Sequence, residues 1–288
     1  MQTEGATGVI GGSGLYQMEG LEVEDEVSVP TPYGPPSDSY ISGNLSGRPV
    51  VFLPRHGRAH ALMPSEVNFR ANIYGFKKLG VERIVAISAV GSMKEEIHPR
   101  HVVLPDQFID RTRRRADTFF GQGVVAHVSF AEPVCAELHA ALREAAESCG
   151  FTVWPEGTYV CIEGPAFSSR AESLLYRSWG VSVVGMTNLP EAKLAREAEI
   201  CYATMALVSD FDCWRGTEEE VSVEMILQTV RENAATAGRI LKALVPALPP
   251  GRSCKCSRAL EKALLTPASQ VSPQARERLD IIIGKYVE

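Results

Sequence analysis

The sequence predicts an α/β fold in which a largely parallel, buried sheet is flanked by helices. Short runs rich in Val and Ile alternate with longer amphipathic stretches through most of the chain, as strands alternate with helices in such folds. The strand-like runs are apolar on both faces, which is typical of a sheet covered on both sides. Three of the amphipathic stretches end at a glycine, a common helix stop.

This alternation defines the expected elements. Strands are expected at Thr7–Ile10, Val50–Leu53, Ile84–Ser88, His101–Leu104, Thr158–Ile162, Ser182–Val184 and Tyr202–Ser209. Helices are expected at Ser65–Leu79, Pro133–Ser148, Ser169–Trp179, Pro190–Ile200 and Val221–Leu244, with Gly80, Gly150 and Gly180 stopping the first three. The last helix is the clearest, because its apolar residues follow steps of three and four. A short helix is also expected over Pro273–Val287.

Length and composition bound the class of protein. A chain of 288 residues can form one large domain or two small ones. With 45% apolar and 22% charged residues it matches globular proteins rather than disordered or fibrous ones. The chain breaks at Pro249-Pro250-Gly251, so we predict a main catalytic domain over residues 1–250 and a C-terminal extension over residues 251–288.

Charge and cysteine usage indicate a cytoplasmic protein that binds neither nucleic acid nor membranes. The net charge is −6, and the densest basic cluster is Arg111, Arg113, Arg114 and Arg115, which fits a solvated loop or a subunit contact better than a nucleic-acid site. No window approaches the ~20 apolar residues of a membrane span, and the N-terminus does not resemble a signal peptide. The seven cysteines are mostly scattered in the sequence, as in reduced intracellular proteins.

Three loops at predicted strand ends suit an anion. Gly11–Gly14 would let the backbone approach a phosphate, although a plain glycine-rich turn explains it equally well. Arg55–His60 contains two arginines and two histidines, which favours dianion capture over an ordinary basic loop or a metal site. Ser88–Ser92 ends a strand in small residues, a feature that packing alone would also explain.

Asp210 and Asp212 end a long apolar run. Their i, i+2 spacing at a strand end can direct two carboxylates into one pocket, although Asp is also common in solvated turns. In an apolar pocket the pair would need donors such as a base amine or a ring N–H. Phe167 and Met186 are apolar residues in strand-to-helix loops, where they could pack under the loop or cover a base or a ribose.

Together these motifs carry a resemblance to a known family. The segments concerned are Gly11–Leu15, Pro54–Arg58, Pro64–Asn72, Asp106–Thr112, Ile162–Pro165, Phe167–Glu172 and Asp210–Trp214. They resemble the methylthioadenosine phosphorylase branch of the trimeric purine nucleoside phosphorylase family, and the likeness extends from residue 7 to about residue 247. The resemblance implies a single-domain purine nucleoside phosphorylase-like fold with a mixed central sheet flanked by helices. It also implies a homotrimer, and whether trimers pair into hexamers stays open.

The resemblance also implies roles for individual residues. Inorganic phosphate, the co-substrate, would be held by Ser13, Arg55, His56, Ser88, Ala89 and Thr187. The nucleoside would be contacted by Phe167 beside the base, Met186 along the ribose, His60, Asp210, Asp212, and an apolar wall of Val223, Ile226 and Leu227 for a 5′-methylthio group. His127 resembles the histidine that a neighbouring subunit lends to the 5′ end of the sugar.

The aspartate pair decides the expected base and the expected acid. Relatives acting on 6-oxopurines tend to carry Asn at the first position, whereas adenine-specific relatives carry Asp-x-Asp, as Asp210 and Asp212 do here. We expect Asp210 to protonate N7 of the leaving base once burial has raised its pKa, with no metal or organic cofactor. Phosphorolysis of methylthioinosine, inosine, guanosine or adenosine is the nearest alternative. A dinucleotide-binding oxidoreductase, disfavoured by the glycine spacing, and a non-catalytic purine-binding protein are the others.

Three features depart from the family pattern or lie outside it. Ala166 stands where relatives usually have Arg, and residues 188–193 differ from a valine-rich stretch. The tail motif Cys254-Lys255-Cys256 resembles one in heat-stable archaeal relatives, where the pair can form a disulfide. From the residues alone, a labile redox pair or two solvated thiols are both compatible, and a zinc site is disfavoured because no second Cys/His pair is nearby in the sequence.

Overall fold

The computed structural model describes residues 5–12, 15, 18–215 and 223–287, and the side chains of residues 223–228, 230 and 231 also lie outside this description. Among the described residues, eleven strands form one sheet. They are β1 (Thr7–Gly11), β2 (Leu21–Val27), β3 (Tyr40–Leu45), β4 (Arg48–Pro54), β5 (Arg83–Ser92), β6 (Val102–Val103), β7 (Gln107–Arg111), β8 (Val153–Trp154), β9 (Thr158–Ile162), β10 (Val183–Gly185) and β11 (Cys201–Phe211). The helices are α1 (Phe69–Lys78), α2 (Ala136–Ser148), α3 (Arg170–Ser178), α4 (Asn188–Glu197), α5 (Val223–Ala247) and α6 (Pro273–Val287).

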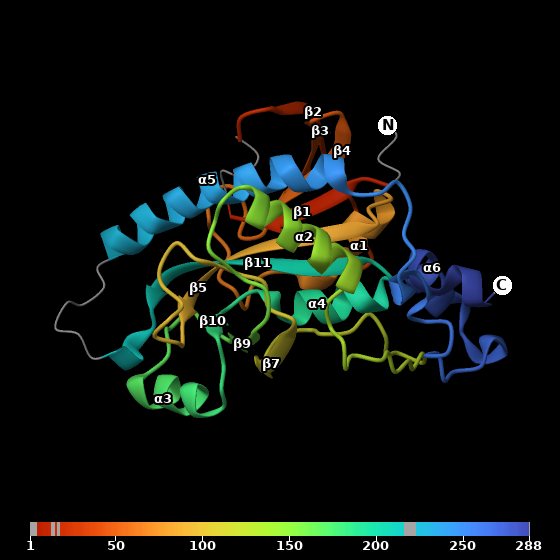
Figure 1. Cartoon of the computed structure of the whole chain (residues 1–288). Helices are drawn as coiled ribbons and strands as arrows, with labels where there is room; N and C mark the ends of the chain where they lie inside the picture. Colours follow the sequence, from red (N-terminus) through yellow and green to blue (C-terminus); the bar gives the residue numbers. More distant parts are fainter. Residues whose placement is uncertain (1–4, 13–14, 16–17, 216–222, 288) are drawn as a thin grey trace.

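Helices cover both faces of the sheet (Figure 1). Helices α2 and α5 pack against each other on one face, and α1 packs against α4 on the other. The alternation of side chains along β5 explains this arrangement, because successive residues of a strand point to opposite faces. Val85 is buried with the α2 and α5 side, whereas Ile84 and Ala86 are buried with the α1 and α4 side. The α/β prediction is therefore confirmed.

The sheet is mixed, so the expectation of a largely parallel sheet is only partly correct. Strands β1, β4, β5 and β11 run parallel, but β2, β3 and β4 form an antiparallel meander. Strand β10 is antiparallel to β5. Seven of the strands were expected from the sequence, whereas β2, β3, β7 and β8 were missed. Their sequences explain why: β2 is charged and mostly exposed, and β3 contains Gly43 and Asn44, which have low strand propensity.

The five helices expected before residue 250 are present as α1 to α5, with boundaries shifted by at most four residues. Gly80, Gly150 and Gly180 have φ of 73°, 77° and 78°, the left-handed conformation that ends a helix at glycine. Helix α1 begins at Phe69 rather than at Ser65, because the side chain of Asn68 accepts a hydrogen bond from the backbone N–H of Ala71 at 3.1 Å. An Asn at this position fixes the start of a helix.

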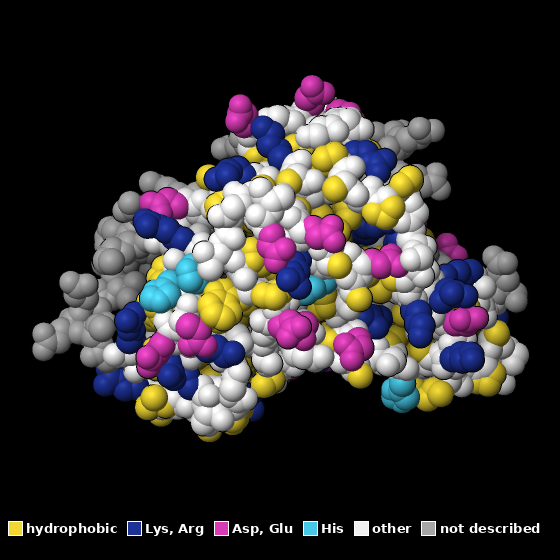
Figure 2. Space-filling model, in the orientation of Figure 1, with side chains coloured by type: hydrophobic (Ala, Val, Ile, Leu, Met, Phe, Trp, Pro, Cys, Tyr) yellow, Lys and Arg dark blue, Asp and Glu magenta, His cyan; other side chains and the backbone are white. Residues whose placement is uncertain are grey.

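The C-terminal residues pack onto the sheet layers. The expected helix over Pro273–Val287 is present as α6, and its residues Leu279, Ile282 and Ile283 are buried in the cluster that contains α1 and α4. The division into residues 1–250 and 251–288 stays a prediction. Within the described part of the chain, no helix is both long enough and apolar enough to span a bilayer. Figure 2 shows acidic and basic side chains interspersed over one face of the molecule.

Candidate active site

The site lies where the central strand β5 changes partner. One edge of β5 pairs with β1 over residues 83–86 and with β10 over residues 91–92. Between these stretches, residues 87–90 have no strand partner on that edge among the described residues. A cavity of about 580 Å³ opens there. Ten of the predicted site residues line it: Arg55, His56, His60, Ser88, Ala89, Phe167, Met186, Thr187, Asp210 and Asp212.

The reversed direction of β10 brings two predicted phosphate ligands together. Because β10 runs against β5, the residues after Gly185 pass the middle of β5, and Thr187 Oγ1 lies 3.1 Å from Ser88 Oγ. Tyr159, which sequence reasoning missed, places its hydroxyl 3.1 Å from Ser88 Oγ. The carbonyl of Ile87 points to this gap, where it accepts from Arg55 Nη1 at 3.0 Å. Because residues two apart in a strand direct their backbone groups to the same edge, we expect the N–H of Ala89 to point there as well. These hydroxyl and amide groups form a donor-rich floor.

Arg55 lies at this floor, but its guanidinium has a different environment from the one expected. It forms a bidentate ion pair with the buried Glu191 and also donates to the carbonyls of Ile87 and Ile10, at 3.0 and 3.2 Å. In this structure Glu191 occupies one face of the guanidinium, so phosphate binding by Arg55 stays a prediction. Glu191 was missed because nothing in the sequence marks it as a partner of a residue 136 positions away.

His56 and His60 form a stacked pair beside the floor, with ring centroids 4.7 Å apart. His56 Nδ1 lies 2.9 Å from the carbonyl oxygen of Leu62. Burial lowers the pKa of His56 to about 4, and the nearby positive charge of Arg55 contributes. The imidazole is therefore neutral at pH 7, with Nδ1–H donating to Leu62 and Nε2 left as an acceptor. Such a ring can accept a hydrogen bond from a protonated oxyanion.

The carboxylate pair lies at the end of β11. A bulge between Val208 and Asp210 shifts the register against β5, and bulges of this kind redirect side chains beside active sites. Asp210 and Asp212 both line the cavity, and Asp210 Oδ2 accepts a hydrogen bond from Ser209 Oγ at 2.6 Å. Burial raises the pKa of both carboxyls, and the charge of Asp212 adds to the increase at Asp210. The pair is thus suited to hold a proton.

Gly91 makes room for this pair. It lies opposite Asp210 in the register of β5 and β11. A methyl group in its place would lie 3.2 Å from Asp210 Oδ1 and 3.3 Å from Asp212 Cβ, closer than nearly all ordinary contacts. The small residues at the end of β5, which packing alone could explain from the sequence, therefore have a specific consequence here. They let the carboxylates lie directly over the strand.

Two loops bound the opposite side of the cavity. Phe167 is 71% exposed although it lines the cavity, so it stands at the mouth. Met186 lies further in, against Gly164. The guanidinium of Arg115 joins the two loops by donating to the backbone carbonyls of Met186 and Glu163 at 2.7 and 2.8 Å. The expectation that this basic cluster is solvated is therefore wrong for Arg115, whose side chain is 1% exposed.

Helix α5 supplies a further wall through Asn233 and Ala234. Asn233, which sequence reasoning missed, is buried and donates to the carbonyl of Val208 at 3.1 Å. The expected 5′ wall of Val223, Ile226 and Leu227 belongs to the same helix, but these side chains lie outside the described residues, as does Ser13. His127 is exposed on a loop and is not among the residues that line this cavity, so its expected role across a subunit boundary stays a prediction.

The geometry combines two kinds of polar group in one cavity. Hydroxyls, a backbone N–H and a neutral imidazole lie around Ser88, and carboxyls with raised pKa lie at Asp210 and Asp212. The first group suits a small oxyanion, and the second can donate protons to nitrogen atoms of a heterocycle. The apolar residues between them offer contact area for the body of a ligand.

The chain belongs to the phosphorylase superfamily, whose sequence profile matches residues 6–246. Among similar proteins is the S-methyl-5′-thioadenosine phosphorylase of Geobacter sulfurreducens, which is 58% identical over 285 residues covering 99% of this chain and 100% of the relative. The protein of the same name from Koribacter versatilis is 54% identical, covering 99% of this chain and 97% of the relative.

Solved structures agree with the sequence relatives. A methylthioadenosine phosphorylase from an antarctic soil metagenomic library superimposes with a TM-score of 0.93 at 48% identity, covering 98% of this chain and 99% of the other. The methylthioadenosine phosphorylase of Schistosoma mansoni in complex with adenine gives a TM-score of 0.84 at 36% identity, covering 89% of this chain and 96% of the other. The family and the fold expected from the sequence are confirmed.

Proposed function

We propose that this protein catalyses the phosphorolysis of S-methyl-5′-thioadenosine to adenine and 5-methylthioribose 1-phosphate. The observation that carries the proposal is the presence of two carboxyls, the half-buried Asp210 and the buried Asp212, in the cavity that also contains the Ser88 and Thr187 hydroxyls. The raised pKa of each carboxyl suits protonation of a leaving purine. The names of the relatives support methylthioadenosine as the substrate.

Inorganic phosphate would bind over the donor-rich floor. Ser88 and Thr187 would donate hydroxyl hydrogen bonds, Ala89 its backbone N–H, and His56 would accept from a protonated phosphate oxygen through Nε2. Arg55 would support this floor from beneath, because its guanidinium donates to the backbone carbonyls of Ile87 and Ile10. Ser13 is a further proposed ligand that lies outside the described residues. These groups would position the anion for in-line attack.

The reaction needs a bond to form and a bond to break at C1′ of the sugar. A phosphate oxygen would attack C1′ as the bond from C1′ to N9 of adenine breaks, through a state with oxocarbenium character. The electron pair of the broken bond passes to the purine, and Asp210 would transfer its proton to N7 so that adenine departs neutral. Asp212 would accept a hydrogen bond from the 6-amino group. The reaction as proposed requires no metal or organic cofactor.

Substrate preference would follow from the two ends of the nucleoside. At the base, a carboxylate accepts from an amino group but not from the oxo group of a 6-oxopurine. At the 5′ end, Val223, Ile226 and Leu227 would offer an apolar wall, which suits a thioether and provides no partner for a 5′-hydroxyl. Phe167 and Met186 would cover the base and the ribose.

Initial rates with methylthioadenosine, adenosine and inosine, each with and without phosphate, test this proposal. Base release from methylthioadenosine is expected to require phosphate and to exceed release from inosine by about 10²-fold or more in kcat/KM, as for sites with unmatched polar groups. A preference for inosine would overturn the 6-aminopurine assignment and leave the 6-oxopurine alternative. Absence of phosphate-dependent release from any purine nucleoside would overturn the enzymatic function.

The proposal includes a homotrimer in the cytoplasm. Leu174 and Leu175 of helix α3 and its C-cap residue Trp179 are 52%, 47% and 43% exposed, and such exposed apolar groups favour burial against another subunit. His127 is exposed and so could reach a neighbouring site. Light scattering after size-exclusion chromatography should give three times the chain mass of 31.3 kDa. A monomer that has full activity would exclude the role given to His127.

A further inference from the structure

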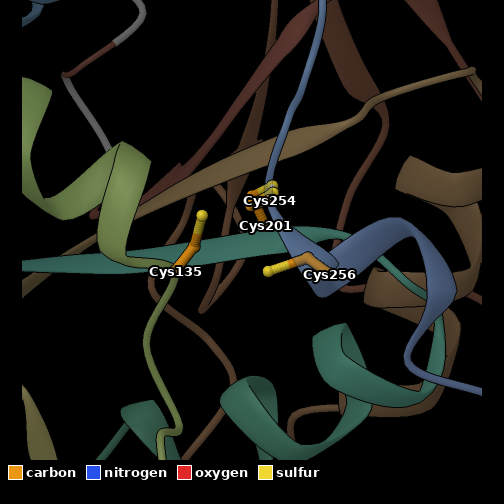
Figure 3. Close-up of side chains that lie close together, drawn as sticks. All are labelled: Cys135, Cys201, Cys254 and Cys256. Atoms are coloured by element: carbon orange, nitrogen blue, oxygen red, sulfur yellow. The ribbon is translucent and has the colours of Figure 1, made fainter.

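Four cysteines that are distant in the sequence lie together in the fold. They are Cys135, Cys201, Cys254 and Cys256, and their four Sγ atoms all lie within 4.8 Å of one another. Figure 3 shows that the side chains converge from the start of α2, the start of β11 and the C-terminal tail. The premise that no second cysteine pair lies near Cys254 and Cys256 is therefore wrong in three dimensions.

The backbone holds each of these cysteines at a fixed structural position. Cys135 is the N-cap of α2, and its N–H donates to the carbonyl of Tyr202 at 2.9 Å, which ties it to the first residues of β11. Cys201 is the first residue of β11. Cys254 caps the short 3-10 helix Lys255–Arg258, which contains Cys256. The thiols are thus positioned by ordered secondary structure rather than by a loose tail.

The cluster is not a pair of solvated thiols. Cys135, Cys201 and Cys256 are 2%, 1% and 7% exposed, and Cys254 is half-buried. The expectation that the tail cysteines are solvated is wrong for Cys256. Because four cysteines rarely gather in a core for packing reasons alone, their reactivity and metal affinity are the properties to consider.

The spacing of the sulfur atoms matches tetrahedral metal binding. Zinc binds thiolates at about 2.3 Å, which places the sulfurs of a four-thiolate site ~3.8 Å apart. The Sγ atoms of Cys201 and Cys254 are 3.3 Å apart, and no pair in the cluster exceeds 4.8 Å. These distances bracket the tetrahedral edge. The soft thiolate set favours zinc over hard cations, and among first-row divalent ions zinc binds such sites more tightly than iron does.

The charges around the cluster also suit a cation bound by thiolates. Four thiolates this close together would repel one another, and a bound divalent cation would compensate their charge. Arg252 lies close by, with Nη1 4.0 Å from Cys201 Sγ, and offsets negative charge on the sulfurs.

We propose that Cys135, Cys201, Cys254 and Cys256 form a structural zinc site that fastens the C-terminal tail to the amino end of β11. Binding of Zn²⁺ would replace thiol protons, releasing up to four to solvent, with no change of oxidation state. All four positions would be filled by protein, as in closed structural sites. The site lies nine residues from Asp210 along β11, or ~30 Å of extended chain, so it would act on stability rather than on the reaction.

Metal content of the full chain tests the proposal directly. The protein is expressed with added Zn²⁺, purified anaerobically with a phosphine reductant, dialysed against metal-free buffer and measured by inductively coupled plasma mass spectrometry. The expected content is about one zinc per chain. The double variant C254S/C256S should retain less than a tenth of that. Cys149→Ser is the matched control, because Cys149 is half-buried outside the cluster, and it should retain the full content.

Cobalt substitution gives a readout that does not depend on any variant folding. When Co²⁺ replaces zinc in the wild-type chain, four thiolate ligands in a tetrahedron give intense visible absorption and a thiolate-to-cobalt charge-transfer band. Titration should saturate at one equivalent, and added Zn²⁺ should remove the bands. A pale spectrum typical of oxygen and nitrogen ligands would overturn the assignment, even if a metal is bound.

Two other outcomes would overturn the proposal. The first is a reduced, metal-free chain that binds neither Zn²⁺ nor Co²⁺ under these conditions. The second is an intact mass lower by four hydrogen atoms with no metal, because two disulfides would leave no thiolate to bind a cation. Removal of bound zinc with a chelator should lower Tm and leave the initial kcat of the folded enzyme unchanged. The metal content, the cobalt spectrum and Tm are independent of whether the proposed substrate is correct.

Discussion

Strand β11 carries a different polar cluster at each end. At its carboxyl end, Asp210 and Asp212 face a cavity of about 580 Å³, and burial raises the pKa of both carboxyls. At its amino end, Cys201 lies within 4.8 Å of three other thiols, and α2 and the C-terminal tail enclose them. Both clusters contain groups that are costly to bury alone. The carboxyl cluster is open to a ligand, whereas the thiols of the cysteine cluster lie against one another.

Along this one strand, we expect the residues that determine stability to differ from those that determine catalysis. Substitutions of the carboxyls at the open end should alter turnover with little effect on folding, because the charge of these carboxyls does not stabilise the native state. Changes among the enclosed thiols should alter folding with little effect on turnover. The ion pair of Arg55 and Glu191 lies beneath the open end and is the first place where this separation could fail.

Glu191→Gln is expected to have the largest effect. Glu191 is 0% exposed and Arg55 is 2% exposed, so the substitution leaves a buried guanidinium without its counter-charge. Loss of one partner from such a pair costs about 3–5 kcal/mol. Urea denaturation at one protein concentration should show this loss in the free energy of unfolding.

The matched control is Glu147→Gln. Glu147 forms an ion pair with Arg143 on the surface of α2, where the two side chains are 47% and 51% exposed. Removal of an exposed i, i+4 pair changes stability by about 0.5 kcal/mol or less. Equal effects for the two variants would show that the Arg55 pair contributes no more to stability than a surface ion pair. The carboxyl end of β11 would then not depend on a buried ion pair for its stability.

Asp210→Asn should follow, with kcat for methylthioadenosine reduced about 10²-fold or more, as expected for loss of a general acid. Asn can still accept the hydrogen bond from Ser209, so the fold should persist. Burial raises the pKa of Asp210, so in the wild type the protonated form, and with it kcat, decreases as the pH rises through that pKa. The variant should lack this descending limb.

Stability gives the second half of this test. A buried carboxyl with a raised pKa loses its favourable contribution as the pH rises from the unfolded to the folded pKa, so at pH 7 the Asn variant should be at least as stable as the wild type. Asp280→Asn, at an exposed position on α6, should change neither property. If Asp210→Asn instead lowers Tm and leaves kcat unchanged, Asp210 has a structural role and not a catalytic one.

Gly91→Ala should have an intermediate effect on both properties. The added methyl group would approach Asp210 Oδ1 to 3.2 Å, and overpacking of this size costs about 1–2 kcal/mol. Displacement of the carboxyls by a few tenths of an ångström should also lower kcat about tenfold. Gly251→Ala is the control, because no atom lies within 4 Å of its added methyl group. Wild-type kinetics for Gly91→Ala would show that the carboxyl position is not critical.

The two ends of β11 also differ in how far the sequence predicts them. Asp210 and Asp212 are two residues apart and end an apolar run, so local spacing indicates a common pocket. The thiol cluster joins residues as far apart as Cys135 and Cys256, and no local pattern records that contact. Loop motifs at strand ends could be found because strands of one direction end at one edge of the sheet.

The features that the sequence did not predict have a common physical origin in long-range pairing. The direction of β10 could not be predicted, because a three-residue apolar run has no direction. Its reversal is what brings Thr187 to Ser88. In the same way, the residue type and loop position of Arg55 indicate an anion site, but they do not predict its ion pair with Glu191. The buried carboxylate that it meets is supplied by α4, far along the chain.

Ser88→Ala is expected to have the smallest effect, and it tests the donor-rich floor separately from the carboxyls. The Ser88 hydroxyl lies 3.1 Å from both Tyr159 and Thr187 and is buried, so its removal deletes one donor without opening a large space. Loss of one hydrogen bond of about 1 kcal/mol should raise KM for phosphate about fivefold and leave KM for the nucleoside unchanged. Ser178→Ala, at an exposed hydroxyl on α3, should change neither. Phosphate and the nucleoside would contact different polar groups of the cavity. A rise in KM for the nucleoside alone would therefore contradict phosphate binding at Ser88 and the roles given to the hydroxyls and the carboxyls.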